Sequence, residues 1–190
     1  MTTHRPILDA GPGLNFFATN KERLLFSVLG PLCVPETVET EIIRKARTDP
    51  RFAAAKTVWN KLPDRLMEVL SDDITDELAA AVERISGIDP EARMRRLADL
   101  GETMVLAHAS VAAEAGTEVL VLIDDEGGQQ DFVREVRRLQ HRRADGHPVG
   151  RIGLVQAITV LERAAGSEYL PNRQAMRDFY GRLRNLDDGL

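Results

Sequence analysis

Residues 118–125 read EVLVLIDD, and this stretch decides the fold class. After Glu118 the run is wholly apolar through Ile123, and it ends on the two acids Asp124 and Asp125. A short strand that is apolar at every position is buried on both faces, which is typical of a parallel sheet covered by helices. We therefore predict an α/β protein with a mainly parallel central sheet.

Two segments nearer the N-terminus predict further strands of this sheet. Residues 5–9 (RPILD) are apolar and end on Asp9, and the sequence Gly11-Pro12-Gly13 after them predicts a turn before a first helix at 14–20. A second short strand is expected at 32–34, followed by a helix that begins at Pro35. Strands that alternate with helices predict βαβ units, and hence a three-layer α/β/α sandwich.

The rest of the chain reads mainly as helices. Residues 48–97 are interpreted as a helical insertion, with a candidate strand at 66–70 and an amphipathic helix at 76–85. Helices are expected at 101–116 and 129–143, then an extended link at 147–153. Two C-terminal helices, at 154–165 and 173–186, fill the range 150–190. Nothing resembles a flexible linker, so residues 1–190 are interpreted as one domain.

Bulk composition limits the classes of protein that this chain can belong to. No run approaches the roughly 20 apolar residues of a membrane span, and the N-terminus lacks the pattern of a signal peptide. The one cysteine, Cys33, excludes an internal disulfide and fits a reducing compartment, so we expect a cytoplasmic protein without membrane contact. The net charge of -5 excludes a generally basic nucleic-acid binder, but a local patch can still bind RNA.

Acidic residues stand at four places where an α/β fold exposes them. Asp9 ends the first strand, Asp124 and Asp125 end the strongest strand, Glu102 opens a long helix, and Glu41 lies at the edge of a buried helix face. Ligand sites in open parallel sheets form beyond the carboxyl ends of the strands. Carboxylates gathered there repel one another unless a cation neutralises them, and Mg²⁺ or Mn²⁺ prefers such oxygen ligands.

Four motifs join these acids, and together they resemble those of the PIN-domain family, especially its bacterial toxin-type ribonucleases. The motifs are, in order, ILDAGPGLNFF around Asp9, VPETVETEI around Glu41, LGETMVLAHA around Glu102, and VLIDDEGG around the acid pair. They spread over residues 6–126 and leave 48–97 unexplained.

The resemblance implies a PIN-like fold and a metal-dependent endoribonuclease that hydrolyses RNA phosphodiester bonds. It implies Mg²⁺ (or Mn²⁺) as the cofactor, an RNA substrate, a small antitoxin protein as partner and a surface for a homodimer. The catalytic residues that it implies are Asp9, Glu41, Glu102, Asp124 and Asp125, and all of these except Glu41 are the implied metal ligands.

One motif departs from the family pattern, and this keeps a second function open. Relatives usually continue the acid pair with a basic residue and Ala-Arg, whereas this chain continues with Glu126-Gly127-Gly128. The alternative is a PIN-like RNA-binding or scaffold protein with a degenerate site. The basic segment with Arg134, Arg137 and Arg138 is interpreted either as an RNA contact or as a solvated helix face.

Overall fold

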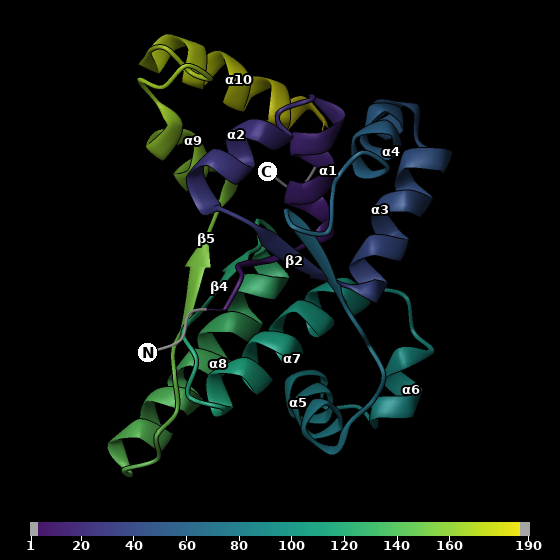
Figure 1. Cartoon of the computed structure of the whole chain (residues 1–190). Helices are drawn as coiled ribbons and strands as arrows, with labels where there is room; N and C mark the ends of the chain where they lie inside the picture. The colour runs from purple at the N-terminus through teal and green to yellow at the C-terminus, as the bar shows by residue number, and fades with distance from the viewer. Residues whose placement is uncertain (1–3, 187–190) are drawn as a thin grey trace.

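The computed structural model describes residues 4–186 and forms a three-layer α/β/α arrangement (Figure 1). The central sheet has five strands, all parallel, in the order β3-β2-β1-β4-β5. These strands are β1 (Ile7–Leu8), β2 (Leu32–Pro35), β3 (Met67–Leu70), β4 (Val119–Leu122) and β5 (Ile152–Val155). The expected α/β class and parallel sheet are therefore confirmed. Residues 1–3 and 187–190 of the expected single domain lie outside the described residues.

Helices cover both faces of the sheet (Figure 1). Because the strand order reverses after β3, the helices between β1 and β3 and the helices between β3 and β5 lie on opposite faces. One layer holds α1 (Ala10–Ala18), α2 (Glu22–Leu29), α3 (Glu36–Thr48), the 3₁₀ turn η1 (Pro50–Phe52) and α4 (Ala53–Trp59). The other holds α5 (Asp76–Ser86), α6 (Pro90–Met94), α7 (Leu100–Glu114) and α8 (Glu126–Ala144). The closing helices α9 (Ala157–Ala164) and α10 (Arg173–Leu186) pack against α2 and α1.

The core consists of apolar side chains between the sheet and its two helical layers. On the sheet itself Ile7, Leu8 and Val121 are fully buried, as expected for strands covered on both faces. Phe16 and Phe17 of α1 fill one layer, and Met104 of the long helix α7 is fully buried in the other. Over residues 4–186, no helix is both long enough and apolar enough to cross a bilayer.

The two edge strands of the sheet differ in how far the sequence indicated them. The candidate strand at 66–70 is confirmed as edge strand β3, which pairs along its whole length with β2, so the stretch 48–97 is not wholly helical. Residues 152–155, expected as a link and the start of a helix, form the opposite edge strand β5, and α9 begins only at Ala157. A strand of four residues beside glycines is too short for its hydrophobic pattern to distinguish it from the start of a helix. Only its pairing with β4 identifies this segment as a strand.

Two helices begin earlier than the sequence suggested. Helix α1 begins at Ala10 and not at Leu14, since Asp9 caps it and Pro12 lies in the first turn, where no backbone N–H is needed. Helix α8 begins at Glu126 and not at Gln129, and Asp125 caps it. The Gly127-Gly128 pair is therefore part of a helix and not of a loop.

Candidate active site

A pocket opens at the carboxyl edge of the sheet, where the strand order reverses. Neighbouring strands β1 and β4 are followed by helices on opposite faces, and their last residues, Leu8 and Leu122, are register partners. Such a switch point leaves a crevice between the two departing chains, and ligands of parallel sheets bind there. Asp9 and Asp124 extend from these two strands on either side of the crevice.

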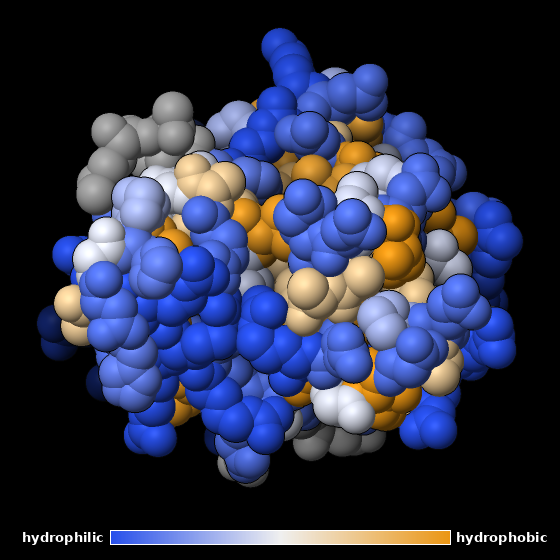
Figure 2. All heavy atoms as spheres, turned by 90° about the horizontal axis from the view of Figure 1, so that it is seen from below, coloured by the Kyte–Doolittle hydropathy of each residue, from blue (hydrophilic) through white to orange (hydrophobic). Residues whose placement is uncertain are grey.

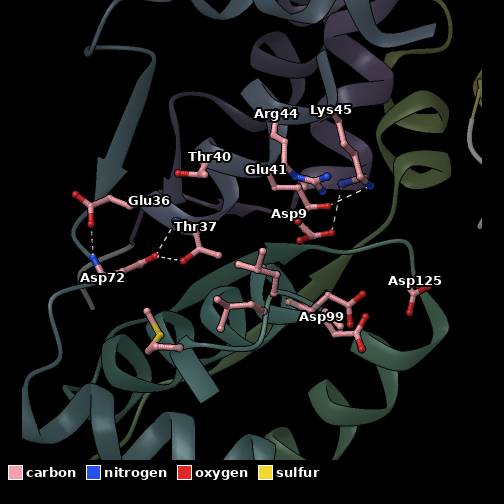
Figure 3. A pocket seen from close by; sticks show the side chains of 18 of the residues that line it. Asp9, Glu36, Thr37, Thr40, Glu41, Arg44, Lys45, Asp72, Asp99 and Asp125 are labelled. Carbon is pink, nitrogen blue, oxygen red and sulfur yellow. Dashed lines mark hydrogen bonds and ion pairs between the residues drawn. The ribbon is translucent and has the colours of Figure 1, made fainter. Parts of the chain in front are cut away.

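All five sequence-predicted catalytic residues line this one cavity, which has a volume of about 800 Å³. They come from β1, α3, α7 and the β4–α8 connection, so four separate segments converge (Figure 3). The described lining residues that carry charge are Asp9, Glu36, Glu41, Arg44, Lys45, Asp72, Asp73, Asp99, Glu102, Asp124 and Asp125. The sequence motifs gave only the order of these acids along the chain, and the structure brings them together in one pocket.

Asp9 is buried in the wall of the pocket. Its side chain is only 7% exposed and accepts a hydrogen bond from the Gly11 backbone N–H at 3.4 Å, which caps helix α1. Burial is the main cause that raises the pKa of Asp9 to about 6. Two backbone hydrogen bonds oppose this rise, and the nearby Glu41 carboxylate contributes to it. Asp9 therefore both caps helix α1 and lines the pocket.

Gly101 explains how Asp9 and Glu41 can come close to helix α7. A Cβ atom at this glycine would lie 3.2 Å from Oε2 of Glu41 and 3.5 Å from Oδ1 of Asp9. The absence of a side chain lets the start of α7 approach β1 and α3 at this point. The Gly-Glu pair of the third motif therefore has a physical reason, because the glycine makes room and Glu102 follows directly.

Gly128 of helix α8 likewise makes room for the carboxylate of Glu102. A Cβ atom there would lie 2.8 Å from Cγ2 of Ile123 and 3.0 Å from Oε2 of Glu102. The carboxylate of Glu102 thus rests on the first turn of α8. Burial, the largest cause, and the negative charges of Asp9 and Asp125 together raise the pKa of Glu102 to about 8.

The two acids after β4 have different surroundings. Asp125 is exposed and accepts a hydrogen bond from the backbone N–H of Gly127 at 2.6 Å, as the N-cap of α8. Asp124 is half-buried, and its Oδ1 accepts a hydrogen bond from the backbone N–H of Ala157 at 2.8 Å, at the start of α9. Asp124 thus links two connections at the carboxyl edge while it also lines the pocket.

Glu41 has a lysine beside it. The Nζ atom of Lys45, one helical turn along α3, lies 3.1 Å from Oε1 of Glu41. The same ammonium group lowers the pKa of Asp9, although burial has the larger, opposite effect. The charge of Glu41 is therefore partly offset by Lys45.

The far end of the pocket is held by a network around Asp72, which follows β3. The buried carboxylate of Asp72 accepts hydrogen bonds from the backbone N–H of Thr37 at 2.7 Å and from the Thr37 hydroxyl, and lies 2.9 Å from Nε2 of His108. Burial raises the pKa of Asp72, but the hydrogen bonds from His108 and Thr37 outweigh it and hold that pKa below its usual range. His108 of helix α7 thus supports α3 through Asp72.

A divalent metal fits the donor chemistry of the pocket. Asp9 is buried and Glu102 is half-buried. The pKa values of both are raised by loss of solvent and by nearby carboxylates, and a cation with oxygen preference would relieve both costs. Within residues 4–186, no three His, Cys, Asp or Glu side chains already form a group that could hold a metal ion. The acids would therefore have to draw closer around an ion.

The arginines of α8 do not line this pocket. Arg134 pairs with Asp131, and Arg138 pairs with Glu135 at 2.7 Å and with Glu114 at 2.5 Å. Arg134 and Arg138 line a separate cavity beside α5, whereas Arg137 is exposed.

Seen from below, the surface of the molecule is mainly hydrophilic with scattered apolar residues (Figure 2).

Several lining residues were missed in the sequence. Asp72, Asp73 and Asp99 belong to no motif, because their place in the pocket comes from tertiary structure alone. Lys45 did carry a signal, since it follows Glu41 by four residues on a helix, the spacing of a side-chain ion pair.

Comparisons with family models, with curated proteins and with solved structures gave no significant match to this chain.

Proposed function

We propose that this protein is a metal-dependent endoribonuclease with a PIN-like fold, and that it is the toxin of a toxin–antitoxin pair. One observation carries the proposal: four sequence motifs that are separated along the chain bring all five of their acids to one pocket. That pocket lies at the switch point of a parallel sheet, where ligand sites are expected.

The acids of the pocket would have two roles, metal binding and orientation of the attacking water. Asp9, Glu102, Asp124 and Asp125 would hold Mg²⁺ or Mn²⁺, since they approach from the two strands and helices that border the crevice. Such a metal, when bound, activates water and stabilises the charge that develops on the phosphate. Glu41, beside Asp9 and held by Lys45, would orient the attacking water or accept its proton.

A cleavage assay tests the enzyme proposal. Purified protein, unfolded and refolded to remove any bound inhibitor, is incubated with a mixed RNA pool in Mn²⁺, Mg²⁺ or EDTA. We expect cleavage in both metals, none in EDTA, and a loss of at least about 100-fold in Asp9→Asn, because even outer partners of a metal contribute 10- to 100-fold.

The matched control is Asp73→Asn, which removes an exposed carboxylate from the far end of the same pocket. It should cleave like the wild type. Cleavage that persists in EDTA, or that survives in Asp9→Asn, would show that these acids do not form a metal-dependent nuclease site.

The second candidate is a PIN-like RNA-binding or scaffold protein with a degenerate site. It is favoured by the hydrogen bonds that Asp124 and Asp125 make to Ala157 and Gly127, since both give these carboxylates a structural role. This candidate predicts RNA binding without cleavage in any metal.

The cellular setting remains part of the proposal. We propose a cytoplasmic protein, because the one cysteine, Cys33, is buried as a free thiol. A small antitoxin would cover the acidic pocket, and the closing helices would be the place for a homodimer. Co-purification of the product of the adjacent reading frame tests the antitoxin.

A further inference from the structure

The charge of the pocket raises a difficulty for an RNA substrate. Of the charged lining residues that the structure describes, nine are Asp or Glu and only two, Arg44 and Lys45, are basic. An RNA strand carries a negative charge on every phosphate, and such strands are bound mainly through cations. One or two divalent ions cannot balance nine carboxylates and the phosphates as well. The two basic side chains are therefore the groups of the pocket that could attract the phosphates of an entering RNA strand.

Both basic residues lie on one wall of the pocket, in the C-terminal half of α3. Figure 3 shows Arg44 and Lys45 pointing from this helix toward Asp9 and Glu41. Lys45 is half-buried, with its ammonium group 3.1 Å from Oε1 of Glu41. A lysine ammonium has three donors, so this ion pair leaves donors for a second acceptor. Arg44 is exposed and precedes Lys45 on the same helix, where it also lines the pocket.

We propose that Arg44 and Lys45 are positioning residues that hold backbone phosphates of the RNA strand, so that the strand enters along α3. Lys45, tied to Glu41, contacts the phosphate closest to the acids, and Arg44 contacts a neighbouring phosphate. This inference rests on the proposed ribonuclease function and names the side from which its substrate enters.

The arginines of α8 are less suited to this role. The ion pairs of Arg138 with Glu135 and Glu114 occupy its guanidinium group inside the α7–α8 layer. Glu135 is 3% exposed and also bonds to Ser110 and Arg84, so this network is structural. By contrast, Arg44 and Lys45 line the same cavity as the acids.

The test compares Arg44→Gln and Lys45→Gln with Lys56→Gln, a matched loss of charge at an exposed site on α4 outside the pocket. Binding of a labelled single-stranded RNA pool is followed by fluorescence anisotropy in Ca²⁺, with a gel to check that the RNA stays intact. Cleavage in Mn²⁺ is measured in parallel at several salt concentrations, and KM and kcat are separated.

We expect each pocket variant to bind RNA more weakly and to lower the salt slope of log Kd by about 0.7, the value for one contact to single-stranded nucleic acid. KM should rise more than kcat falls, Lys45→Arg should restore the slope, and Lys56→Gln should match the wild type. A merely structural role of Lys45 would not change the salt slope.

The possible failures are distinguishable. Cleavage with salt slopes equal to wild type in both pocket variants overturns this inference and leaves the ribonuclease proposal intact. If the wild type binds RNA without cleaving it, and the pocket variants lower the salt slope of log Kd, the phosphate contacts are supported and the enzyme proposal is contradicted. Absence of RNA binding by the wild type overturns both.

Discussion

At the scale of single residues, the candidate site depends on two glycines as much as on its acids. Gly101 lies where a Cβ atom would touch Asp9 and Glu41, and Gly128 lies where one would touch Glu102. The sequence pointed to Gly101 through the Gly-Glu motif. It could not explain Gly128, which departs from the family pattern, because only the packing of α8 on Glu102 gives that glycine a reason.

Gly128→Ala tests this packing. The added methyl group would lie 2.8 Å from Ile123 and 3.0 Å from the Glu102 carboxylate, so we expect the free energy of unfolding to fall by about 1–3 kcal/mol. Cleavage should fall as well, because Glu102 is displaced. Chemical denaturation measures the first effect and the RNA assay the second.

The control for this variant is Gly181→Ala in α10, where a Cβ atom meets nothing within 4 Å. In an open helical position alanine is favoured over glycine, so this variant should be stabilised by about 0.5–1 kcal/mol. If Gly128→Ala behaved like Gly181→Ala, the close packing of α8 on Glu102 would be contradicted.

At the scale of elements, the sequence predicted those with strong periodicity or apolar character. Strands β1, β2 and β4 and helices α5 and α7 lie close to where they were expected. Strand β5 was missed, because Ile152–Val155 is short, contains a glycine and is recognised only by its pairing with β4. The four acidic positions were found through motifs, and the spacing of Lys45 from Glu41 was a signal that was missed, whereas Asp72 entered the site through tertiary packing alone.

The position of helix α3, which carries Glu41 and Lys45, depends on Asp72. Pro35, the N-cap of α3, has no side-chain acceptor, and Asp72 from the β3–α5 connection accepts the Thr37 N–H in its place. We expect Asp72→Asn to lower the free energy of unfolding at pH 7 by about 1–2 kcal/mol, the usual cost of losing a helix cap.

The pH dependence of this difference follows from the pKa of Asp72, which is lower in the folded state than its usual value. The stabilisation is present above the ordinary pKa of Asp and is lost as the pH falls through the folded value. The gap between wild type and Asp72→Asn in urea denaturation should therefore close in acid. The neighbouring Asp73→Asn should change stability little, and equal stability of all three proteins at pH 7 would contradict the capping role.

At the scale of the whole molecule, topology and charge meet at one edge of the sheet. The strand order places β1 beside β4, so acids from distant parts of the chain gather at the crevice between them. The folded pKa values of Asp9 and Glu102, about 6 and about 8, exceed those of free side chains. Loss of these protons therefore destabilises the metal-free fold as the pH rises toward 8, and a bound cation would remove that cost.

Calorimetric titration with Mn²⁺ at pH 6 and pH 8 tests this central claim most directly. At pH 6 a metal must displace the proton of Glu102, so we predict binding that is at least about tenfold tighter at pH 8 and releases protons at pH 6. Binding should be lost in Asp9→Asn and retained in Asp73→Asn. No Mn²⁺ binding at pH 8, or binding that Asp9→Asn leaves unchanged, would contradict a metal site built on these acids.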